Sequence, residues 1–111
     1  MIRRGDIVYL KNAGYLAAIG HVQGGQRPML IVSNDKGNKT SHIVIAVPLT
    51  TNKRRLDLPT HVIVNDGKSV ALCEQIFTFN QDFIDRKINH INSETMKQVD
   101  KCLAASLGLM I

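Results

Sequence analysis

The chain has 111 residues, of which 44% are hydrophobic and 21% charged, and its formal net charge is +5 at pH 7. That length fits one domain over residues 1–111, which can bury enough surface to fold without a disulfide or a metal. The apolar runs are far shorter than the ~20 residues that cross a bilayer, and no secretory signal opens the chain, so we expect a cytoplasmic protein with no membrane partner.

Strand-like segments separated by loops make up the first 80 residues. Residues 6–10 predict a strand, and residues 11–25 predict a loop interrupted by glycines. Two apolar runs, residues 28–34 and 41–49, flank the turn-forming residues 34–38 and predict a buried antiparallel pair. Pro48 cannot donate to a sheet ladder, so we expect it at a strand end or a bulge. Residues 49–51 would then lie at the mouth of the sheet, with their side chains facing solvent.

The next segments continue this pattern. Residues 52–57 predict an exposed basic loop, residues 60–64 a short strand and residues 65–67 a turn. Residues 69–79 predict the longest strand, and their alternation slips near Glu74 and Gln75, which indicates a bulge or a bent strand.

A helix is predicted near the C-terminus, where the last 30 residues appear mostly helical. Its clearest part runs over residues 93–107, with Asn92 or Ser93 as the N-cap and Gly108 at its end. An apolar stripe faces the core: Met96, Val99, Leu103 and Leu107. Short strands followed by a terminal helix predict a mainly β fold with an appended helix, in the form of a small, bent antiparallel barrel.

Cysteine and histidine spacing predicts neither a disulfide framework nor a metal site. Cys73 and Cys102 lie in apolar segments and are expected to be reduced and buried. The histidines lack the spacing of zinc ligands. We therefore expect no metal and no other cofactor.

The segment Gln23-Gly24-Gly25-Gln26-Arg27-Pro28 is the most informative in the chain. Paired glycines let the backbone turn sharply and leave N–H groups to meet a phosphate. Arg27 stands at the entrance to a buried strand, where its planar guanidinium is a preorganised phosphate donor. The alternative is an ordinary loop with an arginine on its rim.

The chain resembles the MazF/PemK toxin family over essentially its whole length. The resemblance rests on the order and spacing of several short motifs: Gly5-Asp6-Ile7, Gln23-Gly24-Gly25-Gln26-Arg27-Pro28, Asn34, Leu49-Thr50-Thr51, Leu58-Pro59-Thr60-His61-Val62, Ser69-Val70, Glu74-Gln75-Ile76 and Ser106-Leu107-Gly108-Leu109. It implies an SH3-like barrel, a homodimer and an endoribonuclease that cuts cellular mRNA at short single-stranded sequences. It also implies control by an acidic antitoxin protein.

The family's catalytic arginine and threonine correspond to Arg27 and Thr50, and Thr51 could share the threonine's role. In RNA the 2′-hydroxyl can attack the neighbouring phosphorus, so the enzyme supplies alignment, charge stabilisation and proton transfer. Arg27 would stabilise the phosphorane, and Thr50 would bind the scissile phosphate. The implied products are a 2′,3′-cyclic phosphate and a 5′-hydroxyl, formed without a metal.

Many relatives carry glutamate where this chain has Val22, directly before the glutamine-glycine-glycine segment. If that glutamate positions the arginine or accepts a proton, its loss could lower activity or shift the role to another residue. His21 is a candidate substitute because histidine titrates near neutral pH. The alternative is that His21 only contacts RNA.

Polar and basic residues predict the RNA-binding surface. Lys53, Arg54 and Arg55 could follow the RNA backbone, and Gln75 and Thr78 could hydrogen-bond base edges. The remaining candidates are His21, Gln23, Gly24, Gly25 and Thr51. The alternative for residues 53–55 is a solvated loop without a ligand.

A second function is compatible with the same fold. The chain could be a non-catalytic binding module or a toxin that acts on a protein, like the gyrase poisons that share this barrel. The replacement at Val22 favours this alternative. The presence of both Arg27 and Thr50 favours the ribonuclease.

Overall fold

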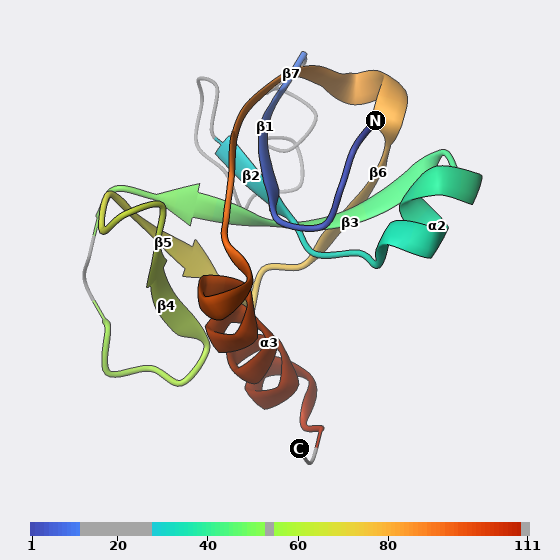
Figure 1. Cartoon of the computed structure of the whole chain (residues 1–111). Helices are drawn as coiled ribbons and strands as arrows, with labels where there is room; N and C mark the ends of the chain where they lie inside the picture. The colour runs from blue at the N-terminus through green and yellow to red at the C-terminus, as the bar shows by residue number, and fades with distance from the viewer. Residues whose placement is uncertain (12–27, 53–54, 110–111) are drawn as a thin grey trace.

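The computed structural model describes residues 1–11, 28–52 and 55–109. Figure 1 shows a curved sheet with a long C-terminal helix lying against it. The elements are β1 (Asp6–Leu10), β2 (Pro28–Ile31), α2 (Asp35–Thr40), β3 (Ile43–Thr50), β4 (His61–Val64), β5 (Ser69–Leu72), β6 (Phe77–Asn80), η1 (Gln81–Phe83), β7 (Ile84–His90) and α3 (Ser93–Leu107).

Strand β3 organises the sheet because it pairs with three others. The strand order is β4-β5-β3-β2-β1-β7, β6 also pairs with β3, and every pairing is antiparallel. The first half of β3, Ile43 to Ala46, pairs with β6, whereas Leu49 and Thr50 pair with β5. Its other edge pairs with β2, with Met29 opposite Pro48. One long strand therefore joins the two halves of the curved sheet.

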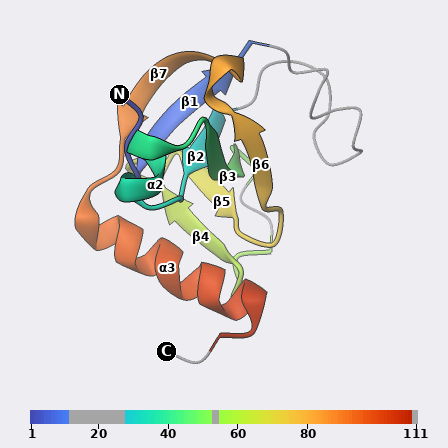
Figure 2. The same cartoon turned by 90° about the vertical axis from the view of Figure 1, so that its right-hand side faces the viewer.

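Both faces of the central strands are buried. Successive side chains of a strand point to opposite faces, so neighbours such as Ile7 and Val8 enter different hydrophobic clusters. One cluster includes Ile7, Leu30 and Leu49 and is covered by α3; the other includes Val8 and is closed by Phe77 and Phe79 of β6. Figure 2 shows α3 running below β4, away from β6. The expected mainly β fold with an appended helix is confirmed.

Helix α3 has the predicted bounds and caps. The Asn92 side chain accepts from the Thr95 amide, and Gly108 ends the helix in the left-handed conformation, with φ 72°. The predicted apolar stripe is only partly right. Met96 and Val99 are buried and Leu103 half-buried, but Leu107 is 59% exposed because the helix extends past the sheet.

Three predicted elements were wrong. Residues 34–38 do not form a simple turn, because Asn34 caps helix α2 by accepting from the Gly37 amide at 2.7 Å. Residues 69–79 form two strands, β5 and β6, rather than one, because the chain leaves the sheet between Leu72 and Phe77. The last 30 residues are not mostly helix, since β7 precedes α3 and pairs with β1.

Pro48 lies inside β3 and pairs with Met29 in an unbroken register, so the prediction of a strand end or a bulge there was wrong. It falls where β3 changes partner from β6 to β5. The prediction that residues 49–51 face solvent was also partly wrong. Leu49 is buried, Thr50 is half-buried and Thr51 is exposed.

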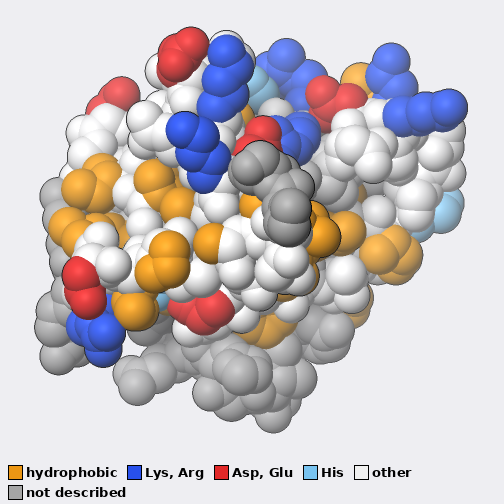
Figure 3. Space-filling view, turned by 90° about the horizontal axis from the view of Figure 1, so that it is seen from below, with side chains coloured by type: hydrophobic (Ala, Val, Ile, Leu, Met, Phe, Trp, Pro, Cys, Tyr) orange, Lys and Arg blue, Asp and Glu red, His pale blue; other side chains and the backbone are white. Residues whose placement is uncertain are grey.

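Hydrophobic side chains also reach the surface. Figure 3 shows them among polar groups on the face seen from below, with lysine and arginine gathered towards the upper edge of the view. The large exposed ones include Ile43, Ile88, Leu107 and Leu109. None of the described helices has the length and apolar character needed to cross a membrane.

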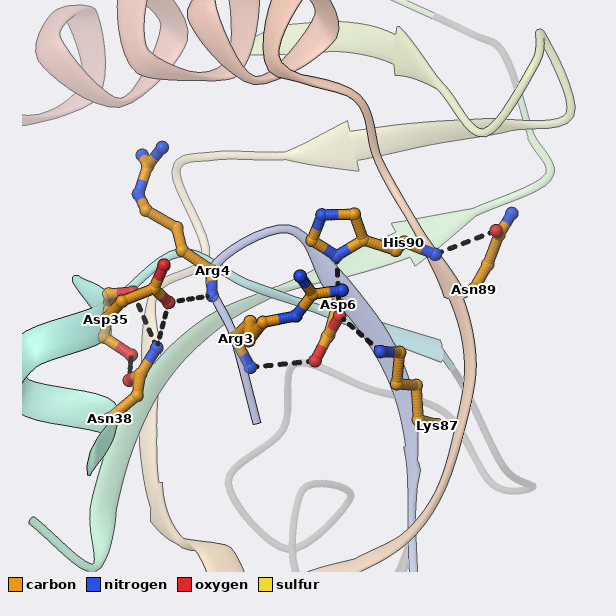
Figure 4. A network of polar contacts seen from close by, with 9 residues as sticks. Arg3, Arg4, Asp6, Asp35, Asn38, Lys87, Asn89 and His90 are labelled. Carbon is orange, nitrogen blue, oxygen red and sulfur yellow. Dashed lines mark hydrogen bonds and ion pairs between the residues drawn. The ribbon is translucent and has the colours of Figure 1, made fainter. Parts of the chain in front are cut away.

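A polar network holds the N-terminal segment (Figure 4). Asp6 is fully buried and accepts from the Arg3 amide at 2.8 Å and from Nδ1 of His90 at 2.7 Å, while Nζ of Lys87 lies 3.2 Å away. Arg4 donates its amide to Asp35 of α2 and pairs with Asp100 of α3. The first residues are thus tied to both helices and to β7.

Candidate active site

Thr50 lies at the end of β3 beside an open pocket. The pocket has a volume of about 360 Å³ and is lined by Thr50, Asn52, Arg55 and Leu72. Oγ1 of Thr50 accepts a hydrogen bond from the Asn52 amide at 3.1 Å. A hydroxyl has one proton to donate and two lone pairs that accept, so this bond leaves the proton for donation to a ligand.

Sheet pairing brings the other pocket residues to Thr50. Thr50 faces Val70 of β5, and Leu72, at the end of β5, faces His61 of β4. The segment that precedes β4 therefore folds back over the end of β3. This return places Arg55 beside Thr50, five residues later in the chain.

Arg55 has an unusual backbone and a short-range ion pair. Its φ of 62° lies in the left-handed region, which residues with a side chain rarely adopt. Nε lies 3.3 Å from Oδ1 of Asp57, and that hydrogen bond lowers the pKa of the Asp57 carboxyl. Both side chains are largely exposed, so the pair adds little stability.

His61 connects this segment to the turn after β5. Its Nε2 lies 2.7 Å from Oε1 and 2.8 Å from Oε2 of Glu74, and its Nδ1 lies 3.1 Å from the carbonyl oxygen of Arg55. His61 and Glu74 were part of the family resemblance but not of the predicted site. The only signal in the sequence that His61 lies near the site was that Leu58-Pro59-Thr60-His61 follows the basic residues 53–55 closely.

Of the predicted RNA-binding residues, four are described: Arg55 lines the Thr50 pocket, whereas Thr51, Gln75 and Thr78 do not. Thr51 is exposed and adjacent to Thr50. Gln75 is half-buried, and its Oε1 is buried with no hydrogen-bond partner among the described residues. Thr78 is exposed on β6 opposite Ile45, which is roughly 16 Å from Thr50 along an extended strand. Thr78 is therefore not brought to the pocket.

The other predicted site residues lie outside the described residues: His21, Gln23, Gly24, Gly25, Arg27, Lys53 and Arg54. The register of β2 on β3 still bears on the glycine-rich segment. Met29 faces Pro48, so β2 begins at the same end of the sheet as Thr50. In residues 1–11, 28–52 and 55–109, no three His, Cys, Asp or Glu side chains gather closely enough to hold a metal ion.

The fold and site are thus a curved antiparallel sheet covered by α3, with the Thr50 hydroxyl in an open pocket at the end of β3. Residues 3–107 match the family described as PemK-like, MazF-like toxins of type II toxin–antitoxin systems, and the chain belongs to this family. It is 35% identical to endoribonuclease EndoA of Bacillus subtilis (strain 168), over 99% of this chain and 97% of that protein.

Solved structures show the same fold. An endoribonuclease in complex with its cognate antitoxin from Mycobacterial species has a TM-score of 0.82 and 28% identity, covering 100% of this chain and 99% of that one. MazF (Form-I) from Deinococcus radiodurans has a TM-score of 0.77 and 21% identity, covering 97% of each chain. The expected family is confirmed. The expected enzyme class, endoribonuclease, is the activity named for both the Bacillus subtilis relative and the Mycobacterial one.

Proposed function

We propose that the chain, as a single toxin domain over residues 1–111, is a sequence-specific endoribonuclease that cuts single-stranded mRNA without a metal. The observation that carries the proposal is the Thr50 hydroxyl, which opens onto a pocket at the end of β3 where β2 also begins. The names of EndoA and of the Mycobacterial relative support the class of reaction.

Cleavage proceeds by attack of the RNA 2′-oxygen on the adjacent phosphorus. The P–O bond to the 5′-oxygen breaks, which leaves a 2′,3′-cyclic phosphate and a 5′-hydroxyl. Thr50 donates its hydroxyl proton to a phosphate oxygen, because the bond from the Asn52 amide uses one lone pair of Oγ1 and leaves that proton available.

Arg27 stabilises the charge on the phosphorane and protonates the leaving oxygen. It directly precedes Pro28, the first residue of β2, at the Thr50 end of the sheet. A guanidinium is a reluctant base because it stays protonated. The residue that accepts the 2′-hydroxyl proton is not assigned; His21 is one candidate and would have to be neutral to act.

Binding of the RNA strand uses the segments around this pocket. Gln23, Gly24, Gly25, Lys53 and Arg54 would contact the backbone, with Thr51 beside the scissile phosphate. Gln75 is the better candidate for base recognition, because its buried Oε1 would gain a hydrogen bond from a base amino group. Thr78 would contact only a more distant nucleotide.

Two protein partners complete the proposal, an acidic antitoxin and a second copy of this chain. The Mycobacterial relative was solved with its antitoxin, and the net charge of +5 suits an acidic partner. Exposed Ile43, Ile88 and Leu107 offer apolar surface for such contacts. Action on mRNA would place the protein in the cytoplasm.

The test is cleavage of a long single-stranded RNA by antitoxin-free protein in excess EDTA, with both new ends mapped. We expect cuts at a short motif with cyclic phosphate and 5′-hydroxyl ends. Thr50→Val and Arg27→Gln should each lower kcat by about a hundredfold or more. Thr40→Val is the matched control, since the Thr40 hydroxyl donates to the Lys36 carbonyl within α2, away from the pocket.

RNA that stays intact with or without EDTA would contradict the ribonuclease. Toxicity that persists in Arg27→Gln without RNA cleavage would favour the protein-binding alternative, in which the target is a topoisomerase. RNA cut only when a divalent metal is added would overturn the metal-independent mechanism while preserving the enzyme class.

A further inference from the structure

The His61 ring lies between two groups that can only accept hydrogen bonds. Nε2 is 2.7 Å from a carboxylate oxygen of Glu74, and Nδ1 is 3.1 Å from the carbonyl oxygen of Arg55. A neutral imidazole carries a proton on one ring nitrogen, and only the imidazolium carries one on each. Both bonds are therefore made at once only when His61 is positively charged.

The bond to Arg55 matters because of where that residue lies. The Arg55 carbonyl also accepts from the Leu58 amide at 3.1 Å, while its side chain lines the Thr50 pocket. Its left-handed backbone is intrinsically unfavourable and needs surrounding contacts to persist. The His61 side chain is only 11% exposed, so water competes little for these two bonds.

Charged and titratable groups reach His61 from each element around it. Glu74 comes from the turn after β5, and Asp57 and Arg55 from the preceding segment. On the α3 side, the Cys102 thiol donates to the His61 carbonyl at 3.8 Å. The Arg55 guanidinium is paired with Asp57.

We propose that His61 is a positioning residue for the Thr50 site, which acts by tying the main chain of Arg55 to Glu74 as an imidazolium. The proposal rests on the ribonuclease function only for its effect on cleavage. When His61 loses a proton, one of its two hydrogen bonds breaks. Arg55, which lines the pocket beside Thr50, is then held less firmly. Cleavage therefore falls when a rise in pH removes that proton.

This dependence has the opposite sign to that of a histidine base. If deprotonation of His21 governed the rate, cleavage would rise with pH, because only neutral imidazole accepts a proton. The slope of kcat against pH therefore separates the two roles. His21→Ala should remove a rise of kcat with pH, and His61→Gln should remove a fall, so the two variants show which histidine causes each.

The first test needs no RNA. In ¹⁵N NMR of the full chain at about pH 6, we expect both ring nitrogens of His61 to carry protons. The Leu58 amide should exchange about tenfold faster in His61→Gln than in the wild type. His42→Gln is the matched control, because His42 precedes β3 at the end opposite Thr50. A single neutral tautomer, or unchanged exchange of Leu58, would overturn the proposal.

The second test measures cleavage by His61→Asn, His61→Gln and Glu74→Gln. Each amide at position 61 supplies a neutral donor to one of the two partners. We expect kcat to fall by about ten- to a hundredfold, KM to change by less than about threefold, and the decline of kcat with rising pH to disappear. A kcat and pH profile like those of the wild type would refute the positioning role.

Thermal unfolding by circular dichroism distinguishes loss of positioning from loss of folding. If the substitutions at position 61 unfold the chain, Glu74→Gln decides, since Glu74 is at the surface and His61 stays in place. Wild-type protein that leaves RNA intact would contradict the proposed ribonuclease function. The NMR result would still decide whether both ring nitrogens of His61 are protonated.

Discussion

Asp6 shows how one side chain can tie the start of the chain to the rest of the sheet. Burial alone would raise the pKa of its carboxyl, but hydrogen bonds from the Arg3 amide, His90 and Lys87 outweigh burial and lower the pKa from its ordinary 3.8. A carboxyl with a lowered folded pKa stabilises the fold above its unfolded pKa, at about pH 4. That stabilisation is lost as the pH falls through the folded pKa.

Asp6→Asn should destabilise the protein by about 3 kcal/mol at pH 7, because a neutral amide would face donors that the buried carboxylate now satisfies. The difference from the wild type should begin to shrink below about pH 4, where the unfolded chain binds a proton, and disappear as the pH falls through the lowered folded pKa of Asp6. Urea unfolding at a series of pH values measures both effects. Asp85→Asn, an exposed carboxylate on β7, should change stability by less than about 0.5 kcal/mol.

At the residue scale the sequence identified a threonine but not its surroundings. Thr50 was predicted from the family resemblance and does line a pocket. Arg55 was predicted as one of three basic loop residues that could follow the RNA backbone, but not as a neighbour of Thr50, and the His61 contacts were not predicted at all. These residues meet because β4 pairs with β5 and β5 with β3, which no local pattern specifies.

Among the elements, α3 was the most predictable because its signals are local. Asn92 and Gly108 cap it, and its apolar positions repeat with the helical period. By contrast, β7 was missed. Six of its seven residues are exposed, so its sequence shows no alternation between buried and exposed positions. Its strand conformation comes from pairing with β1.

The Asn92 cap gives a quantitative test at this scale. Asn92→Ala should cost about 1 kcal/mol of unfolding free energy, because the Thr95 amide, 2.8 Å from Asn92 Oδ1, would lose its acceptor. Asn92→Asp should stay within a few tenths, since a carboxylate also caps and favours the positive end of the helix. Chemical unfolding followed by far-UV circular dichroism compares them. Equal stability of the two variants would show that the cap contributes nothing.

Across the whole molecule, the two hydrophobic clusters share the central strands, so they should unfold together. Cys73 and Cys102 are free, buried and in the cluster beneath α3. Burial, with smaller contributions from Cys102 and Glu74, raises the pKa of the Cys73 thiol from 9.0 to about 12. Its thiolate fraction at neutral pH is therefore about a thousandfold lower than that of an ordinary cysteine.

Cys73 should accordingly react with a thiol reagent only through unfolding. In native protein at pH 8 we expect labelling at least about a thousandfold slower than in urea. The labelling rate should rise about fivefold in Asn92→Ala, because a loss of about 1 kcal/mol of stability raises the unfolded population by that factor. Mass spectrometry of the labelled peptides provides the measurement. Fast labelling of Cys73 in the native state would mean that α3 opens independently of the sheet.

The sequence by itself determined the family, the alternation that builds the buried strands and the capped helix α3. These follow from side-chain periodicity and capping, which act over a few residues. Only the tertiary structure decided that residues 69–79 divide into two strands, that β7 completes the sheet and that Arg55 meets Thr50. Those outcomes depend on pairing between distant segments, whose free energy comes from the assembled sheet rather than from any one stretch of chain.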